Sequence, residues 1–298
     1  MSQEKQVTGV HFRAEFIPNN SKTHIYTGTW EPSEFPIKAN VVFVHSYAEH
    51  ITRYDGVFKR FASEGIKIHG FDQVGCGKTG ERANDLGGAL GLSRVLLDIT
   101  DAIDRVHDPE VPLFLMGHSF GGACCLNYLA MGDRKALIHG TIALSPCLQV
   151  SDESRPFFPI QMLLDQMSSI FPTLKFPVHL DAKYLSRKIE EVRNYVADPN
   201  IFARSSLIQL RDVLYEGGAF MKSRYAKVQV SRLLIVHGTE DKISCPKASA
   251  TTYQKLKENG KIPYLEFKPY DGGYHELLND VCRDEVSADL MSWISKHI

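Results

Sequence analysis

The chain has 298 residues, 43% of them hydrophobic, so it is long enough to bury a large core in one or two domains. Its net charge of -1 and the lack of a polybasic run argue against nucleic-acid binding and against electrostatic attraction to membranes. The polar first six residues and the absence of a long apolar run predict neither a secretion signal nor a membrane span. Six cysteines without a C-x-x-C pair are typical of reduced thiols, so we expect a cytoplasmic protein.

From about Val41 to Ser145, predicted strands alternate with predicted helices, which is typical of an α/β fold with a parallel sheet. An early strand is predicted at residues 40–44, an apolar run after its first residue. This strand leads directly into residues 45–50, which have the sequence His-Ser-Tyr-Ala-Glu-His. We call residues 45–50 the oxyanion loop, because they are predicted to act together with Ser119 farther along the chain.

Residues 75–80 match the G-x-G-x-x-G pattern of phosphate-binding loops and follow a predicted strand. A P-loop, however, would require its first glycine at Asp72. Residues 81–91 are also too rich in glycine for the phosphate-binding helix that both motifs need. We therefore predict no nucleotide site here.

Residues 117–121 have the sequence Gly-His-Ser-Phe-Gly and lie between an apolar strand pattern, residues 111–116, and an apolar segment long enough for a helix, residues 122–129. A serine on such a turn, with small neighbours, is the nucleophile elbow of the α/β-hydrolase fold. Ser119 is therefore the predicted nucleophile. By its position, Phe120 supplies one N–H of an oxyanion hole.

The second N–H of an oxyanion hole in this fold comes from the loop after an early strand. Residues 45–50 occupy that place, and Tyr47 is the candidate donor.

The alternation of strands and helices breaks after Ser145 and resumes at Arg232, which predicts an inserted helical cap. We place this cap segment at residues 147–228 of a single domain, residues 1–298. Four apolar side chains of the cap segment recur at helical spacing on one face: Ile160, Leu163, Leu164 and Met167. Two interpretations stay open, a helix packed on the core or an exposed lid that docks on lipid and admits an acyl chain.

Two later junctions of strand and loop supply an acid and a base. Residues 232–236 predict a buried strand that precedes Asp241, and residues 264–267 predict a strand that leads to His275. The order serine, aspartate, histidine along the chain is that of the α/β-hydrolase triad. In such a triad the imidazole takes the serine proton, and the carboxylate orients the imidazole. Asp271 is the rival acid, and we favour Asp241 because it follows its own strand.

Seven segments resemble the monoacylglycerol lipase family over most of the chain. They are residues 45–54, 71–79, 117–122, 185–187, 195–199, 237–241 and 273–275. The resemblance implies an α/β-hydrolase fold with a mostly parallel central sheet flanked by helices. It also implies a serine hydrolase, without metal or cofactor, that cleaves monoacylglycerols to fatty acid and glycerol. Glu49, Arg53 and Tyr195 would lie on its glycerol-facing side, while a local surface ion pair is the alternative for Glu49 and Arg53.

Two features depart from the family pattern. Family members carry glycine where this chain has Ser46 and Ala48, so a positive φ at either position would reshape the oxyanion loop. The family's glycerol pocket also uses a histidine three residues after the catalytic one, where this chain has Leu278.

The predicted partner is a monoacylglycerol or a related lipid ester, with peripheral contact to a membrane or lipid droplet through the cap segment, and no nucleic acid. A lysophospholipase or a broad carboxylesterase is the enzymatic alternative, since either has the same triad with a different head-group pocket. The alternative from another class is an inactive hydrolase-fold protein that binds lipid.

Overall fold

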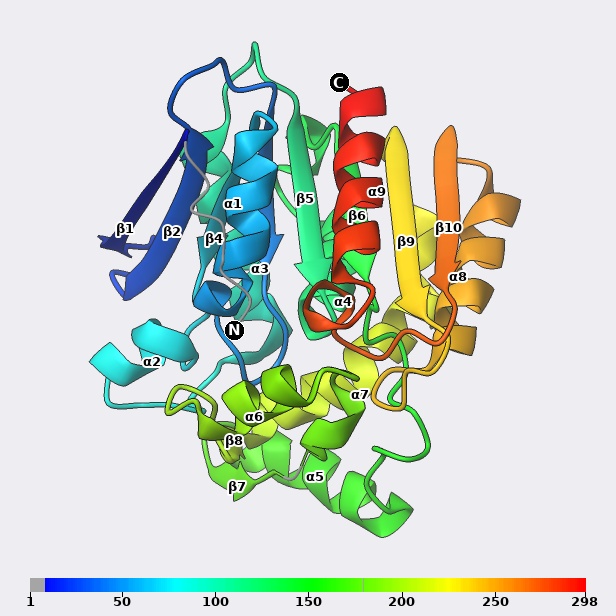
Figure 1. The fold of residues 1–298 in the computed structure, drawn as a ribbon. Coiled ribbons are helices and arrows are strands. Elements are labelled where there is room, and N and C mark those ends of the chain that lie inside the picture. The colour runs from blue at the N-terminus through cyan, green and yellow to red at the C-terminus, as the bar shows by residue number, and fades with distance from the viewer. Residues whose placement is uncertain (1–8, 179) are drawn as a thin grey trace.

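A computed structural model describes residues 9–178 and 180–298, which form a central sheet between layers of helices (Figure 1). The strand order is β1-β2-β4-β3-β5-β6-β9-β10. β2 is antiparallel to both of its neighbours, and all other pairs are parallel. The strands are β1 (Val10–Pro18), β2 (His24–Pro32), β3 (Ala39–Val44), β4 (Ile66–Phe71), β5 (Leu113–His118), β6 (Gly140–Leu144), β9 (Arg232–Gly238) and β10 (Tyr264–Tyr270). This mainly parallel sheet with flanking helices confirms the predicted fold class.

Helices cover both faces of the sheet. The α-helices of the described chain, those of the cap included, are α1 (Asp55–Ser63), α2 (Gly77–Arg82), α3 (Gly91–Val106), α4 (Phe120–Met131), α5 (Phe158–Ile170), α6 (Ile189–Ala197), α7 (Leu207–Lys222), α8 (Pro246–Asn259) and α9 (Arg283–Lys296). Within β3, Val41 and Phe43 join the core beneath α1 and α9, while Val42 and Val44 join the core beneath α3, α4 and α8. Successive side chains of a strand point to opposite faces, so a strand covered on both sides must be apolar throughout. No helix in the described ranges combines the length and the apolar character needed to cross a bilayer.

The turn from β5 to α4 brings the helix against the sheet at very short range. Ser119 sits on this turn with φ 54° and ψ -116°. A Cβ on Gly121 would collide with the carbonyl oxygen of Val44, and a Cβ on Gly117 would lie 2.5 Å from the Gly121 carbonyl oxygen. Only glycine fits at these two positions, because backbone atoms cannot move aside as a flexible side chain can.

Between β6 and β9 the chain forms α5, α6, α7 and a two-stranded sheet of β7 (Lys175–Pro177) and β8 (Arg204–Ser206). These elements lie together beyond the carboxyl ends of β5 and β9 (Figure 1). They fall within the predicted cap segment, whose limits at residues 147 and 228 stay a prediction.

The glycine-rich stretch at residues 81–91 receives the cap segment. The Ser206 N–H donates to the Gly87 carbonyl oxygen at 2.8 Å, and the Leu92 N–H donates to Asp212 Oδ2 at 2.7 Å. A Cβ on Gly87 would collide with the carbonyl oxygen of Arg204. The glycine at residue 87 therefore allows close approach of the cap segment.

At the start of α2, the backbone N–H of Lys78 already has a protein acceptor and is not free to bind a phosphate. The carboxylate of Asp72, fully buried, accepts the Lys78 N–H at 2.8 Å and the Ile51 N–H at 2.9 Å. This internal cap is consistent with the prediction that the G-x-G-x-x-G pattern is not a nucleotide site.

Substituting alanine at two helical glycines tests the close approach of α4. Gly121→Ala should lower the free energy of unfolding by about 3 kcal/mol, because the new Cβ has no room beside β3. Gly218→Ala on the exposed side of α7 is the matched control, since nothing lies within 4 Å of its Cβ. It should raise the free energy of unfolding by about 0.5–1 kcal/mol through helix propensity. Urea denaturation measures both, and equal effects would contradict the explanation.

Candidate active site

Ser119, His275 and Asp241 form a continuous hydrogen-bonded chain. Ser119 Oγ lies 2.8 Å from His275 Nε2, and His275 Nδ1 lies 2.7 Å from Asp241 Oδ2. All three side chains are buried, and they follow the carboxyl ends of β5, β10 and β9 respectively. The structure thus brings the three predicted residues together. Asp271 lies apart from them, exposed and 3.4 Å from the Thr239 hydroxyl.

The Asp241 carboxylate is held by hydrogen bonds from its own loop. Its Oδ1 accepts the backbone N–H groups of Ile243 at 2.8 Å and Ser244 at 3.0 Å. Its Oδ2 accepts the Ser244 hydroxyl at 2.8 Å and lies 3.0 Å from His237 Nε2. Burial alone would raise the pKa of Asp241, but the charge of His275 and the hydrogen bonds from both histidines outweigh it and hold that pKa well below its usual range. Asp241 is therefore an ionised, fixed partner for His275.

The oxyanion loop follows β3 and brings Tyr47 to the same cavity as Phe120. Phe120 is the first residue of α4, so its N–H has no acceptor within the helix. Within the described chain, the Tyr47 N–H also has no hydrogen-bond acceptor. Ala48 takes φ 56° despite its Cβ, whereas Ser46 is not at positive φ. Ala48 thus adopts the left-handed backbone conformation that glycine favours.

Glu49 fixes this loop from the inside. Glu49 Oε1 accepts the Ser46 N–H at 2.6 Å and the Tyr54 hydroxyl at 2.8 Å, and Glu49 Oε2 lies 2.6 Å from an Arg53 guanidinium nitrogen. Arg53 also forms two 2.7 Å hydrogen bonds to Glu276 and stacks 4.9 Å from the centre of the Tyr195 ring. The Glu49 side chain is 1% exposed and the Arg53 side chain 8%, so the ion pair is buried and does not lie at the surface. Burial alone would raise the pKa of Glu49, but His118 and Arg53 hold it well below its usual range.

His118 joins the nucleophile turn to the loop of the base. Its Nε2 donates to the His275 carbonyl oxygen at 3.1 Å, and its Nδ1 lies 3.0 Å from the Tyr54 hydroxyl oxygen. Because the Tyr54 hydroxyl already donates to Glu49, its oxygen accepts from His118 Nδ1, which requires both ring nitrogens to be protonated. Burial would lower the pKa of His118, but the hydrogen bond and charge of Glu49 outweigh it and raise that pKa.

A cavity of about 520 Å³ opens onto Ser119 and His275. One part of its wall, which we call the head-group end, consists of Glu49, His118, Tyr195 and Glu276. The cap segment supplies much of the remaining wall through apolar side chains that include Ile160, Leu163, Leu164, Met167, Phe176, Val213 and Leu214. Arg53 does not line the cavity and lies behind the carboxylates. Leu278 packs in the core beneath α1 and α9 and does not line the cavity either.

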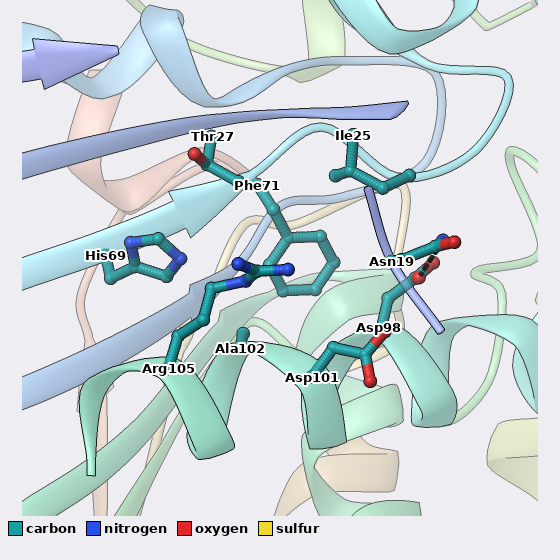
Figure 2. Close-up of a pocket in the computed structure, with 9 residues that line it drawn as sticks. All are labelled: Asn19, Ile25, Thr27, His69, Phe71, Asp98, Asp101, Ala102 and Arg105. Carbon is teal, nitrogen blue, oxygen red and sulfur yellow. Dashed lines mark hydrogen bonds between the residues drawn. The ribbon is translucent and has the colours of Figure 1, made fainter. Parts of the chain in front are cut away.

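A second cavity, between β2, β4 and α3, has a volume of only about 20 Å³ (Figure 2). Its wall includes His69, whose burial lowers its pKa to about 3, and Asp98, which accepts a 3.1 Å hydrogen bond from Asn19. This space has room for about one water molecule, so the cavity beside Ser119 is the one that suits a substrate. The described residues contain no cluster of His, Cys, Asp and Glu side chains that could hold a metal ion.

Four residues of this site were not predicted from the sequence: His118, His237, Ser244 and Glu276. The role of each depends on where its side chain points, and the hydrophobic periodicity of the sequence does not reveal that. Glu276 and His118 do stand next to predicted catalytic residues, which is the signal that could have drawn attention to them.

Residues 36–281 match the family model described as "Serine aminopeptidase, S33". A putative monoglyceride lipase of Schizosaccharomyces pombe is 30% identical over 92% of this chain and 71% of its own length. A monoacylglycerol lipase of Mycolicibacterium smegmatis is 29% identical over 90% of this chain and 92% of its own length. The crystal structure of Paleococcus ferrophilus monoacylglycerol lipase is 26% identical, with a TM-score of 0.79, over 92% of this chain and 99% of that one. The chain therefore belongs to the S33 serine aminopeptidase family and has the α/β-hydrolase fold of the monoacylglycerol lipases that it resembles.

Proposed function

We propose that the protein is a serine hydrolase that cleaves the ester bond of monoacylglycerols to a fatty acid and glycerol. The observation that carries this proposal is the hydrogen-bonded chain from Ser119 through His275 to Asp241, which opens into a largely apolar cavity. The monoacylglycerol substrate is supported by relatives that carry the name monoglyceride or monoacylglycerol lipase.

In the proposed mechanism, His275 takes the proton of Ser119 Oγ as this oxygen attacks the ester carbonyl. The N–H groups of Tyr47 and Phe120 stabilise the negative charge that develops on the carbonyl oxygen. His275 then gives its proton to the departing glycerol oxygen, which leaves an acyl group on Ser119. A water activated by His275 attacks this acyl-enzyme, and the fatty acid is released as Ser119 regains its proton. Asp241 stabilises the imidazolium form of His275 in both steps.

The walls of the cavity suggest how the substrate lies. The apolar residues of α5 and α7 suit the acyl chain, since each buried methylene contributes about 0.8 kcal/mol. The four residues of the predicted apolar face on α5 all line this cavity, and Ile160 and Leu163 are also half exposed. This position supports the role of the cap segment, residues 147–228, as a lid that admits the acyl chain.

We also propose that the cap segment contacts membranes or lipid droplets. Several large apolar side chains of this segment face solvent: Phe157, Met162, Ile170, Phe171 and Leu174. A patch of this kind is a typical membrane interaction site.

The triad assignment is tested by replacing each of the two candidate acids with asparagine. Asp241→Asn should lower kcat by about 10⁴-fold, because an amide does not hold His275 in the productive tautomer. Asp271→Asn is the matched control and should stay within a few fold of the wild type, since its side chain is exposed. Ser119→Ala should abolish turnover of a monoacylglycerol and labelling by a fluorophosphonate probe. A wild-type protein that the probe fails to label would instead be an inactive lipid-binding protein, and the reverse ranking of the acids would assign Asp271 to the triad.

Membrane contact is tested on residues that do not line the cavity. Ile170→Glu combined with Phe171→Glu should weaken binding to lipid vesicles at least about tenfold, because two exposed apolar side chains no longer bury in the lipid. Hydrolysis of a short soluble ester should be unchanged. Leu97→Glu, at an exposed leucine on α3, is the control for surface charge and should bind vesicles as the wild type does. Wild-type binding should also survive high salt, and unchanged binding by the double variant would contradict the contact.

A further inference from the structure

The two cations beside the head-group end, Arg53 and His118, are hydrogen-bonded to protein groups. Arg53 gives its NH1 and NH2 groups to Glu49 and Glu276 and lies behind the cavity wall. His118 has one ring nitrogen on the His275 carbonyl oxygen and the other on the Tyr54 oxygen. An anionic head group would therefore find neither cation available for hydrogen bonding.

Acceptor capacity, in contrast, remains at the same place. A carboxylate oxygen accepts about two hydrogen bonds. Among the described residues, Glu276 Oε1 accepts only from Arg53 NH1, and Glu49 Oε2 also accepts only from Arg53 NH1. Each of these oxygens can take one more donor, such as the hydroxyl of a polyol.

The fixed charges of the whole cavity point the same way. Its described wall holds four carboxylates, those of Glu49, Glu153, Asp181 and Glu276. The cations on that wall are His118, whose ring nitrogens bond protein oxygens, and Arg155, which donates to the Val150 carbonyl oxygen at 2.8 Å and lies 3.5 Å from Asp152. The protein has no such imbalance overall, with a net charge of -1.

We propose that Glu276 is a specificity-determining residue, which keeps Arg53 away from the cavity and leaves carboxylates facing the head group. The enzyme then hydrolyses esters with uncharged or cationic head groups and rejects those with an anionic phosphate. This inference rests on the proposed ester hydrolase activity and names the class of head group. It also predicts a substrate that the likeness to monoacylglycerol lipases does not, an acyl ester of choline.

The test uses three octanoyl esters below their critical micelle concentrations: octanoylglycerol, octanoylglycerol phosphate and octanoylcholine. For the wild type, kcat/KM should be at least about tenfold lower for the phosphate ester than for octanoylglycerol. Octanoylcholine should be hydrolysed, with a higher kcat/KM than the phosphate ester. Glu276→Gln keeps the shape but removes one charge, and it should raise the ratio of kcat/KM for the phosphate ester to that for octanoylglycerol by about tenfold. Glu258→Gln, at an exposed position of α8, is the matched control and should leave this ratio unchanged.

A purely structural role for Glu276 would lower turnover of all three esters in parallel and leave the ratio constant, which would overturn the proposal. Equal wild-type kcat/KM for the phosphate ester and octanoylglycerol would overturn it without any variant, so a Glu276→Gln protein that fails to fold does not remove the test. Failure of the proposed monoacylglycerol lipase function would appear differently. Octanoylglycerol would then be a poor substrate, while p-nitrophenyl octanoate and the ratio of the two charged esters would still report on Glu276.

Discussion

The guanidinium of Arg53, held between the carboxylates of Glu49 and Glu276, is the contact on which the geometry of the site depends. Glu49 belongs to the oxyanion loop, and Glu276 directly follows His275. Through Tyr54 and His118 the same network reaches the residue before Ser119. The oxyanion loop, the residue before Ser119 and the residue after His275 are thus tied to one buried cluster. Removing one partner from a buried ion pair typically costs about 3–5 kcal/mol, so these loops have little freedom to move independently.

The order of the proposed catalytic residues could be predicted from sequence because each follows a predicted strand. Parallel strands end at one edge of the sheet, so Ser119, Asp241 and His275 meet there once the strands are recognised. The partners of Arg53 could not be predicted in the same way. Whether the Arg53 side chain points into the cavity or behind its wall depends on Glu276, which lies more than two hundred residues away along the chain. For the same reason His237 was unremarkable in the sequence, although it lies beside the Asp241 carboxylate.

The cap segment shows a second limit of pattern analysis. The spacing of Ile160, Leu163, Leu164 and Met167 predicts one apolar face, but two different partners satisfy such a face. In the fold this face borders the cavity beside Ser119 and is neither fully covered by core nor turned wholly to solvent. Likewise, the glycines at residues 81–91 signal close backbone approach without saying to what. Only the fold identifies the approaching groups as β8 and α7 of the cap segment.

Three of the five non-glycine residues with positive φ in the described chain surround the catalytic centre. Ala48 lies in the oxyanion loop, Ser119 is the proposed nucleophile, and the Ser145 carbonyl oxygen accepts the hydroxyl of Ser244, which also bonds Asp241. Such a conformation costs about 1–3 kcal/mol per residue, against a total stability of about 5–15 kcal/mol for a typical domain. Selection for stability alone would replace these residues with glycine. The chain is therefore less stable than it could be at the places where it holds a reactive geometry. Packing in the sheet and its two helical layers offsets that loss of stability.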